Sequence, residues 1–237
     1  GVGKTELAKT LAEALFDSEK NIYRAPAENI QSRQFYVNGI RATCARKDID
    51  AAGWTYDNGE FGHTAPAEFS YLKDLHNLSE AELVYYSAWT NPRCKIKSVS
   101  VDEDETVKVE MQQPGWNSIR NKGGSSAKNP WYIENAYEFL DEEGEWYLDV
   151  ADGYLYYKPR QGENLENAYT VLAANDGEMV TIAGSSPDTV IKNLLFSGIT
   201  FSYSTWMRPS TAYGHSDAQN NHLRDSADKT LSGDTLP

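Results

Sequence analysis

The chain has 237 residues and a formal charge of −13, from 35 acidic and 22 basic side chains. With 40% hydrophobic and 24% charged residues, the composition is that of a folded protein and argues against intrinsic disorder. No run of 18 apolar residues occurs, so no membrane span is predicted. The acidic balance argues against nucleic acid as a partner. Two cysteines, Cys44 and Cys94, cannot form a disulfide framework, and without a CxxC motif they indicate no zinc cluster.

Residues 1–22 predict an amphipathic helix of about four turns. Leu7, Leu11 and Leu15 recur at helical spacing among strong helix formers. The first five residues, GVGKT, resemble the end of the phosphate-binding loop GxxxxGK[ST]. The whole segment is similar to the second nucleotide-binding module of Clp-type AAA+ disaggregases.

That resemblance implies ATP and Mg²⁺ as ligands. Backbone amides near Gly1 and Gly3 would hold the phosphates, Lys4 would contact the β- and γ-phosphates, and Thr5 would reach the metal. The sequence contains no Walker B pattern of four apolar residues running into Asp-Glu. We therefore expect a foreign helix joined to another protein by truncation or misassembly. An ATP-binding chaperone fragment is kept as the alternative.

From residue 23 onward the sequence predicts short β-strands. Residues 34–37 and 40–42 flank Asn38-Gly39, a dipeptide that favours a tight hairpin turn. Residues 96–101 and 107–111 alternate polar and apolar side chains and predict a second hairpin.

A meander is predicted over residues 131–140, 145–150 and 154–158, with Asp152-Gly153 suited to a two-residue connection. A capping box at 79–82 favours a short helix through residues 83–85. Together, these patterns predict an inserted antiparallel β domain over residues 62–168, preceded by N-terminal strands over residues 23–61.

Residues 169–237 follow a different pattern. Residues 179–184 predict a short buried strand, and residues 193–201 read Asn-x-x-Phe-x-Gly-x-x-Phe. Phe196 and Phe201 would point inward in one coil of a right-handed parallel β-helix, whose strands stack on copies above and below. One coil cannot bury both faces, and no second coil is visible, so we expect a first coil that is cut short.

A second resemblance is spread over residues 23–225, in blocks at 32–42, 82–85, 89–94, 133–141, 144–149, 155–159, 202–206 and 214–219. Together they are similar to glycoside hydrolase family 141, which includes fucosidase- and xylanase-type enzymes. The resemblance implies a mainly β fold: the start of a right-handed parallel, pectate-lyase-like β-helix, interrupted by an antiparallel insertion domain. It also implies hydrolysis of glycosidic bonds in complex polysaccharides, and an extracellular or periplasmic location, although no signal peptide is visible here.

Glycoside hydrolysis uses two carboxyl groups, one as acid and one as base or nucleophile. We assign Asp217 to catalysis with His215 setting its charge, because both lie in a loop after the coil strand. Trp206, Tyr203 and Arg208 would bind the sugar, since flat aromatic faces stack on sugar rings. The second carboxylate is expected on a further coil, which would leave this chain inactive by itself.

Structural interpretations of the same residues stay open. Asp217 and His215 also suit a hydrogen-bonded turn that joins two coils, and the aromatic residues also suit core packing. Weaker catalytic candidates are Asp225, Asp149 and Glu145. His63, His76 and His222 are predicted as ordinary surface or turn residues, and we expect no cofactor or metal. A non-catalytic carbohydrate-binding β-helix protein is the third functional alternative.

Overall fold

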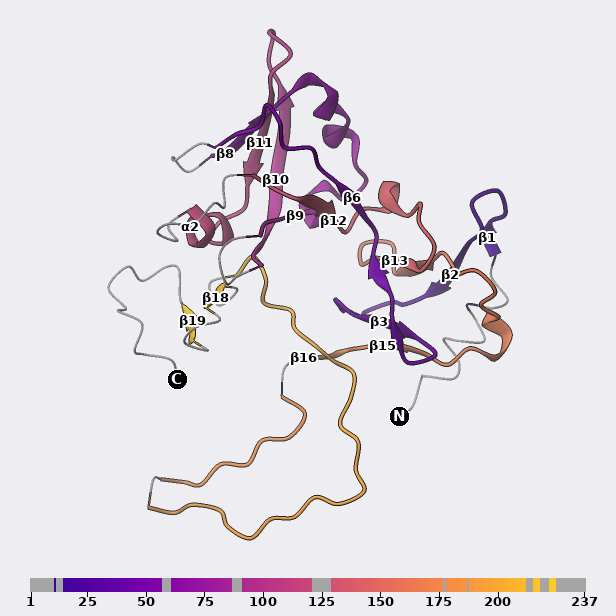
Figure 1. Cartoon of the computed structure of the whole chain (residues 1–237), viewed down its shortest axis with the longest axis vertical. Coiled ribbons are helices and arrows are strands. Elements are labelled where there is room, and N and C mark those ends of the chain that lie inside the picture. Colours follow the sequence, from indigo (N-terminus) through magenta and orange to yellow (C-terminus); the bar gives the residue numbers. More distant parts are fainter. Residues whose placement is uncertain are drawn as a thin grey trace.

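The computed structural model describes residues 11, 15–56, 61–86, 91–120, 129–174, 178–186 and 188–211, and the backbone of 175–176, 215–217 and 222–224. Within this part the protein is mainly β, as predicted, and its larger sheets are almost entirely antiparallel (Figure 1). The helical turns described are short, and none could cross a bilayer. They are α2 (Gly115–Arg120) and the 3₁₀ turns η1 (Ala67–Asp74), η2 (Leu78–Glu80), η3 (Tyr137–Phe139) and η4 (Leu165–Asn167).

The larger sheet has seven described strands, and its long hairpin rises to the top of Figure 1. The strands, in spatial order and all antiparallel to their neighbours, are β6 (Arg46–Asp48), β12 (Tyr132–Glu134), β9 (Glu82–Val84), β10 (Arg93–Val101), β11 (Val107–Met111), β8 (Gly62–Ala65) and β7 (Thr55–Tyr56). The predicted second hairpin is confirmed as β10 and β11. Val107 and Val109 are buried and Lys108 between them is exposed, as alternation requires.

The helix predicted for residues 83–85 is wrong. Residues Glu82–Val84 form β9, whose side chains are all buried and whose backbone pairs with β10 on one side and β12 on the other. Helical structure in this region is limited to the turn η2. Hydrogen bonds to two neighbouring strands outweigh a local helix preference of a few tenths of a kcal/mol per residue.

A second sheet has five described strands: β1 (Leu15–Asp17), β2 (Ile22–Pro26), β14 (Tyr154–Tyr157), β13 (Glu145–Asp149) and β5 (Thr43–Cys44), in that order. Strands β13 and β14 confirm the last two strands of the predicted meander. Its first strand, predicted at residues 131–140, is wrong as a neighbour of these two, because β12 pairs with β6 and β9 in the larger sheet and the turn η3 follows it. The connection between β13 and β14 is also longer than the predicted two residues. Four residues separate the paired Asp149 and Tyr154. Gly153 takes φ +72° at the end of this loop and its N–H binds the Asp149 carbonyl at 2.8 Å.

The N-terminal helix predicted over residues 1–22 is wrong from Leu15 onward. Leu11 is helical and buried, but Leu15–Asp17 form β1, which pairs antiparallel with β2. The Asp17 carboxylate accepts hydrogen bonds from the backbone N–H groups of Glu19 and Lys20, both at 3.0 Å, and so closes the turn. Pairing with β2 therefore overrides the helix propensity of this segment.

Smaller sheets complete the described part. Strands β15 (Thr170–Leu172), β3 (Phe35–Val37) and β4 (Ile40–Arg41) form one, and the predicted Asn38-Gly39 turn is confirmed, with φ +53° and +78°. Strand β16 (Asn175–Asp176) pairs in parallel with β17 (Ser204–Thr205), and β18 (His215–Asp217) pairs antiparallel with β19 (His222–Arg224).

Two hydrophobic cores underlie these sheets. One gathers around Trp116 of α2 and Leu83 and Ile96 of the larger sheet, and the other around Phe35, Trp146 and Leu155. Strands from residues 22–48 pair with strands from residues 132–157 in both large sheets. The N-terminal strands therefore share their sheets with the predicted insertion.

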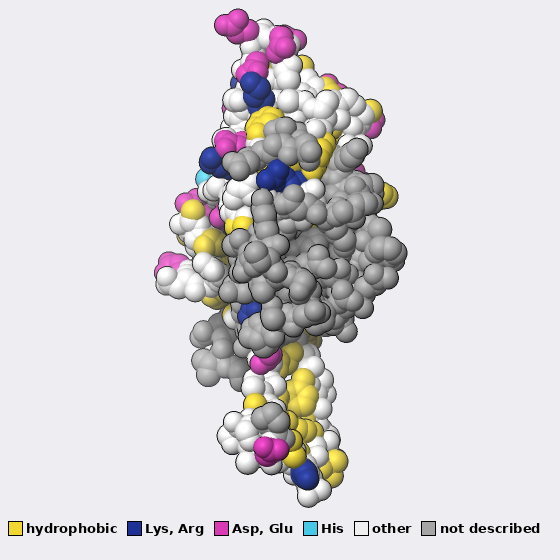
Figure 2. Space-filling view, turned by 90° about the vertical axis from the view of Figure 1, so that its left-hand side faces the viewer, with side chains coloured by type: hydrophobic (Ala, Val, Ile, Leu, Met, Phe, Trp, Pro, Cys, Tyr) yellow, Lys and Arg dark blue, Asp and Glu magenta, His cyan; other side chains and the backbone are white. Residues whose placement is uncertain are grey.

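No strand is assigned to the described residues between 178 and 203, which leave the body as a long loop at the bottom of Figure 1. The strand predicted at 179–184 is not formed, and the coil pattern at 193–201 also forms no strand, so a β-helix coil is not confirmed. Phe196 and Phe201 contact each other at 5.8 Å between ring centroids, but each is about half exposed. Apolar side chains run along this loop in Figure 2, and Leu195 among them is 87% exposed.

Candidate functional site

A pocket of about 500 Å³ lies where the ends of β5, β6, β10 and β12 come together. We call it the arginine pocket, because four guanidinium groups share its walls with aromatic rings and amides. It is lined by Ser32, Arg33, Gln34, Arg41, Ala42, Thr43, Cys44, Arg46, Asn91, Arg93, Tyr132, Glu134, Asn135, Trp146, Trp206 and Pro209.

Two of the four arginines are held by buried carboxylates. Arg33 donates from Nη1 and Nη2 to the two oxygens of Glu82, at 2.8 and 2.6 Å. Arg93 donates from Nε to Oε1 of Glu134 at 2.6 Å, and Arg33 Nη2 lies 3.5 Å from the same oxygen. Burial by itself lowers the pKa of both guanidinium groups, but the facing carboxylates raise it above the usual value. Both arginines are therefore fixed cations.

The two carboxylates come from neighbouring strands, since Glu134 of β12 is paired in register with Glu82 of β9. Two like charges opposite each other would repel, and the guanidinium groups between them offset this. Glu82 has no exposed side-chain surface and Glu134 only 8%. Because both are occupied by arginine and almost buried, this pair supports the pocket and does not supply an acid and a base to a sugar.

Neutral polar groups complete the wall beside Arg93. Burial, followed by the charge of Glu134, raises the pKa of Tyr132 to about 12, so its hydroxyl stays protonated near neutral pH. That hydroxyl accepts a hydrogen bond from Arg93 Nη2 at 3.3 Å. Burial likewise raises the pKa of the Cys44 thiol, which makes Cys44 a poor nucleophile. The pocket is therefore suited to binding through hydrogen bonds and charge.

Trp206 is the predicted site residue that the structure brings to this pocket. It is 36% exposed, directly after β17. The segment is fastened from both sides: Thr205 Oγ1 accepts from the Arg33 N–H at 3.1 Å, and Ser210 Oγ accepts from the Lys95 N–H at 2.7 Å. These bonds hold the indole at the pocket, where a partly exposed flat ring can stack on a sugar.

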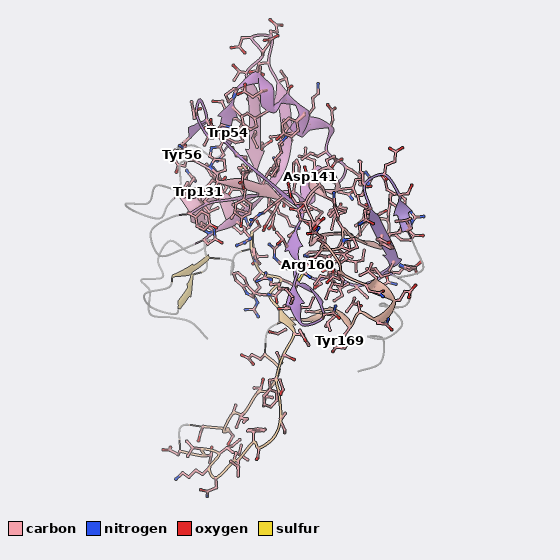
Figure 3. The ribbon with its side chains drawn as sticks, turned by 45° about the vertical axis from the view of Figure 1, so that its right-hand side comes forward. Trp54, Tyr56, Trp131, Asp141, Arg160 and Tyr169 are labelled. Carbon is pink, nitrogen blue, oxygen red and sulfur yellow. The ribbon has the colours of Figure 1, made fainter. Side chains whose placement is uncertain are left out.

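Aromatic rings continue from the pocket to the protein surface. Tyr132 lies 6.4 Å from Tyr86, and Tyr86 makes an edge-to-face pair with Trp131 at 4.6 Å between centroids. Trp131, labelled in Figure 3, is 59% exposed and Tyr86 is 45% exposed. We call Tyr132, Tyr86 and Trp131 the aromatic strip.

The other predicted sugar-binding residues do not line this pocket. Tyr203 packs edge-on against Tyr36 at 4.8 Å, and Arg208 is exposed outside the lining. His215 and Asp217 lie on β18, where they pair in register with Arg224 and His222, and their side chains are outside the described part. Gly1, Gly3, Lys4 and Thr5 also lie outside the described residues.

Two histidines make more contacts than their prediction as ordinary surface or turn residues implied. The prediction that His63 is a surface or turn residue is wrong: its ring is buried among Trp54, Tyr85 and Trp116. His76 does lie in a turn, but it has a partner 73 residues later, since Nε2 is 2.9 Å from Oδ2 of Asp149.

Among the described residues, His76, Asp149 and Asp152 are the group close enough to hold a metal ion, with ligating atoms within 4.8 Å of one another. Asp149 Oδ1 already accepts from Asn77 Nδ2 at 3.0 Å and from the Asp152 N–H at 2.9 Å. The weaker candidate Glu145 accepts three backbone N–H groups, from Arg46, Asp141 and Glu142. These hydrogen bonds join turns to strands, so the carboxylates of Asp149 and Glu145 both have a structural role.

Comparison with known proteins finds a family match over the region that forms most of the two large sheets. The sequence profile of the GH141 insertion domain matches residues 21–160, more than half of the chain. The chain belongs to the GH141 insertion-domain family. This confirms the predicted relationship to glycoside hydrolase family 141, and the family match begins at residue 21, earlier than the predicted insertion at residue 62.

A solved structure described as a glycoside hydrolase is similar to this GH141 insertion domain and its flanks, with a TM-score of 0.66 and 26% sequence identity. The match covers 82% of this chain and 35% of the other, so the chain spans about a third of that hydrolase. Among curated proteins, none matches the chain.

Sequence reasoning missed most of the insertion domain's arginine pocket. Arg33, Arg93, Glu82 and Glu134 lie far apart in the sequence, and although each falls in a block of the family resemblance, none was assigned a role in a site. One signal was present: a single carboxylate ends each of two short apolar strands, Glu82 at the start of β9 and Glu134 at the end of β12. A charge in a buried strand needs a partner, and arginine is the usual one.

Proposed function

We propose that this chain is the carbohydrate-binding part of an enzyme that hydrolyses glycosidic bonds in complex polysaccharides. Its membership of the GH141 insertion-domain family and the similar solved glycoside hydrolase support this proposal. The observation that carries it for this chain is the arginine pocket, where the Trp206 ring stands beside fixed hydrogen-bond donors. Flat rings with convergent donors match the alternating apolar faces and hydroxyl groups of a sugar.

For the enzyme as a whole, we propose fucosidase- or xylanase-type hydrolysis outside the cytoplasm. Asp217 would act as acid or base and His215 would set its charge, because both follow the coil strand in the sequence, close to Trp206 and Arg208. Residues 178–201 would pair with further coils of a parallel β-helix, which would cover the apolar side chains that they now expose. The described carboxylates of the arginine pocket are paired with arginines, which supports a binding role there and hydrolysis elsewhere.

Calorimetric titration of the chain with xylan, pectin and fucosylated oligosaccharides tests the binding role. We expect at least one of these classes to bind, and Trp206→Ala to weaken its binding about tenfold, which corresponds to about 1.4 kcal/mol. Tyr169→Ala is the matched control, because Tyr169 is 44% exposed but does not line the pocket. Absence of binding to every class, or equal binding by the Trp206 variant, would contradict the proposal.

A further inference from the structure

The arginine pocket carries more positive charge than its own carboxylates balance. Arg33 and Arg93 are paired with Glu82 and Glu134. Arg41 and Arg46 also line the pocket, and among the described residues neither has a carboxylate partner. This surplus stands out in a protein with a net charge of −13. Two uncompensated guanidinium groups in one concave site indicate a ligand that brings negative charge.

The surplus charge adjoins the aromatic strip. The Cζ atom of Arg46 lies 5.0 Å from the centroid of the Tyr132 ring, and Tyr132 contacts Tyr86, which contacts Trp131. An oligosaccharide could therefore place one charged group in the pocket and the faces of neighbouring sugars on the exposed rings. Rings of this kind attract sugar faces whatever the charge of the sugar.

We propose that the arginine pocket recognises an acidic oligosaccharide, whose carboxylate or sulfate group is bound by Arg41 and Arg46 while neighbouring sugars lie on the aromatic strip. This rests on the proposed carbohydrate-binding function and names its ligand class. A guanidinium presents parallel N–H donors that match the two oxygens of a carboxylate or the oxygens of a sulfate ester. Glu134 repels the negative group of such a ligand only weakly, because Arg93 and Arg33 already neutralise that carboxylate.

The test compares ligands that differ only in charge. The chain is titrated with oligogalacturonate and with the same oligosaccharide after chemical reduction of its carboxyl groups, and separately with a sulfated oligosaccharide. We expect an acidic ligand to bind at least tenfold more tightly than the reduced one. Binding of oligogalacturonate would identify a uronate carboxylate as the charged group, and binding of the sulfated ligand alone would identify a sulfate ester.

Variants then test which residues bind the acidic group of the ligand. Arg41→Gln with Arg46→Gln should remove the preference for acidic ligand and leave stability unchanged, because both side chains are exposed. Arg46→Gln alone should weaken the preference for acidic ligand, and Lys47→Gln is its matched control: it removes one positive charge from the same strand, β6, but Lys47 lies over the Tyr71 ring, outside the pocket. Trp131→Ala should weaken acidic and reduced ligands by a similar factor.

The outcomes distinguish failure of the acidic-ligand proposal from failure of the proposed carbohydrate-binding function. Equal binding of the acidic and reduced oligosaccharides would overturn acidic recognition and leave the carbohydrate-binding function standing. An acid preference that survives in the double arginine variant would overturn the assignment to Arg41 and Arg46. Failure of all these ligands and of the neutral polysaccharides would overturn both.

Discussion

Arg33 and Glu82 form a two-pronged ion pair at 2.8 and 2.6 Å between residues that lie 49 positions apart. Glu82 belongs to the interior strand β9 and has no exposed side-chain surface, whereas the side chain of Arg33 is 21% exposed and lines the arginine pocket. The pair therefore connects the interior of the larger sheet to the segment before β3. It also fixes one wall of the candidate binding site.

Removal of Arg33 should destabilise the protein strongly. Arg33→Met leaves the buried Glu82 carboxylate without its guanidinium, and such losses cost about 3–5 kcal/mol. Glu82→Leu in the same chain should recover most of that stability, because no unpaired charge then remains. Urea unfolding of both variants measures this. Lys97→Gln, which breaks an exposed ion pair with Glu110, should cost less than about 1 kcal/mol, and an equal cost for both would contradict the interpretation.

His63 should make the protein less stable in mild acid. Its Nδ1 lies 3.1 Å from the Thr55 carbonyl oxygen, which can only accept, so Nε2 accepts from the Tyr85 hydroxyl at 2.9 Å. This neutral ring is buried, and burial lowers its pKa from 6.5 to about 4. Between these two values the unfolded chain binds a proton that the folded chain does not.

The stabilising contribution of neutral His63 is complete above pH 6.5 and is lost as the pH falls toward 4. The loss amounts to about 3 kcal/mol over this interval. It is measured as the difference in unfolding free energy between the original chain and His63→Gln at several pH values. Tyr85→Phe is the control, because it removes the hydrogen bond but keeps the buried imidazole and should keep the pH dependence. Parallel profiles for the original chain and His63→Gln would contradict this account.

The exposed loop of residues 178–201 should promote association. Leu195, Phe196 and Ile199 are 87%, 50% and 59% exposed, and a contiguous apolar surface of this kind favours contact with other chains. Replacing all three with serine should reduce self-association in sedimentation velocity and change the free energy of unfolding by less than about 0.5 kcal/mol per site. Ile40→Ser, on an exposed strand elsewhere, should leave association unchanged. A large loss of stability in the triple variant would instead show that the loop is packed.

Asp217→Asn tests the proposed catalytic role in the full-length protein. We expect kcat/KM on aryl fucosides or xylan to fall about 10²-fold or more with unchanged thermal stability, as for loss of a general acid or base. Asp188→Asn is the matched control, because Asp188 is an exposed carboxylate in the loop of residues 178–201. Unchanged kinetics, or lost folding with intact specific activity, would assign Asp217 a structural role.

Magnesium-ATP should not bind this chain tightly. Leu15–Asp17, which the helix after a phosphate loop would include, form strand β1, and the sequence contains no Walker B pattern. Calorimetric titration should give no dissociation constant below about 1 mM. Micromolar binding that Lys4→Ala abolishes would restore the nucleotide-binding alternative.

Local sequence determined the hairpins and the family. The Asn38-Gly39 turn and the alternating strands β10 and β11 follow from residues a few positions apart, since turn conformation and strand alternation are short-range preferences. The family resemblance was likewise carried by short blocks of sequence, and residues 21–160 match it.

Tertiary structure alone decided β9 and the arginine pocket. Glu82–Val84 has a local pattern that favours helix, but it gains hydrogen bonds from β10 and from β12, which is distant in the sequence. Leu15–Asp17 also has a helical pattern, but it pairs with the neighbouring strand β2 in a local hairpin. Arg33, Glu82, Arg93 and Glu134 become one network only because β9, β10 and β12 lie side by side. Ion pairs between buried groups depend on distances of a few ångströms, and no spacing along the chain encodes these distances.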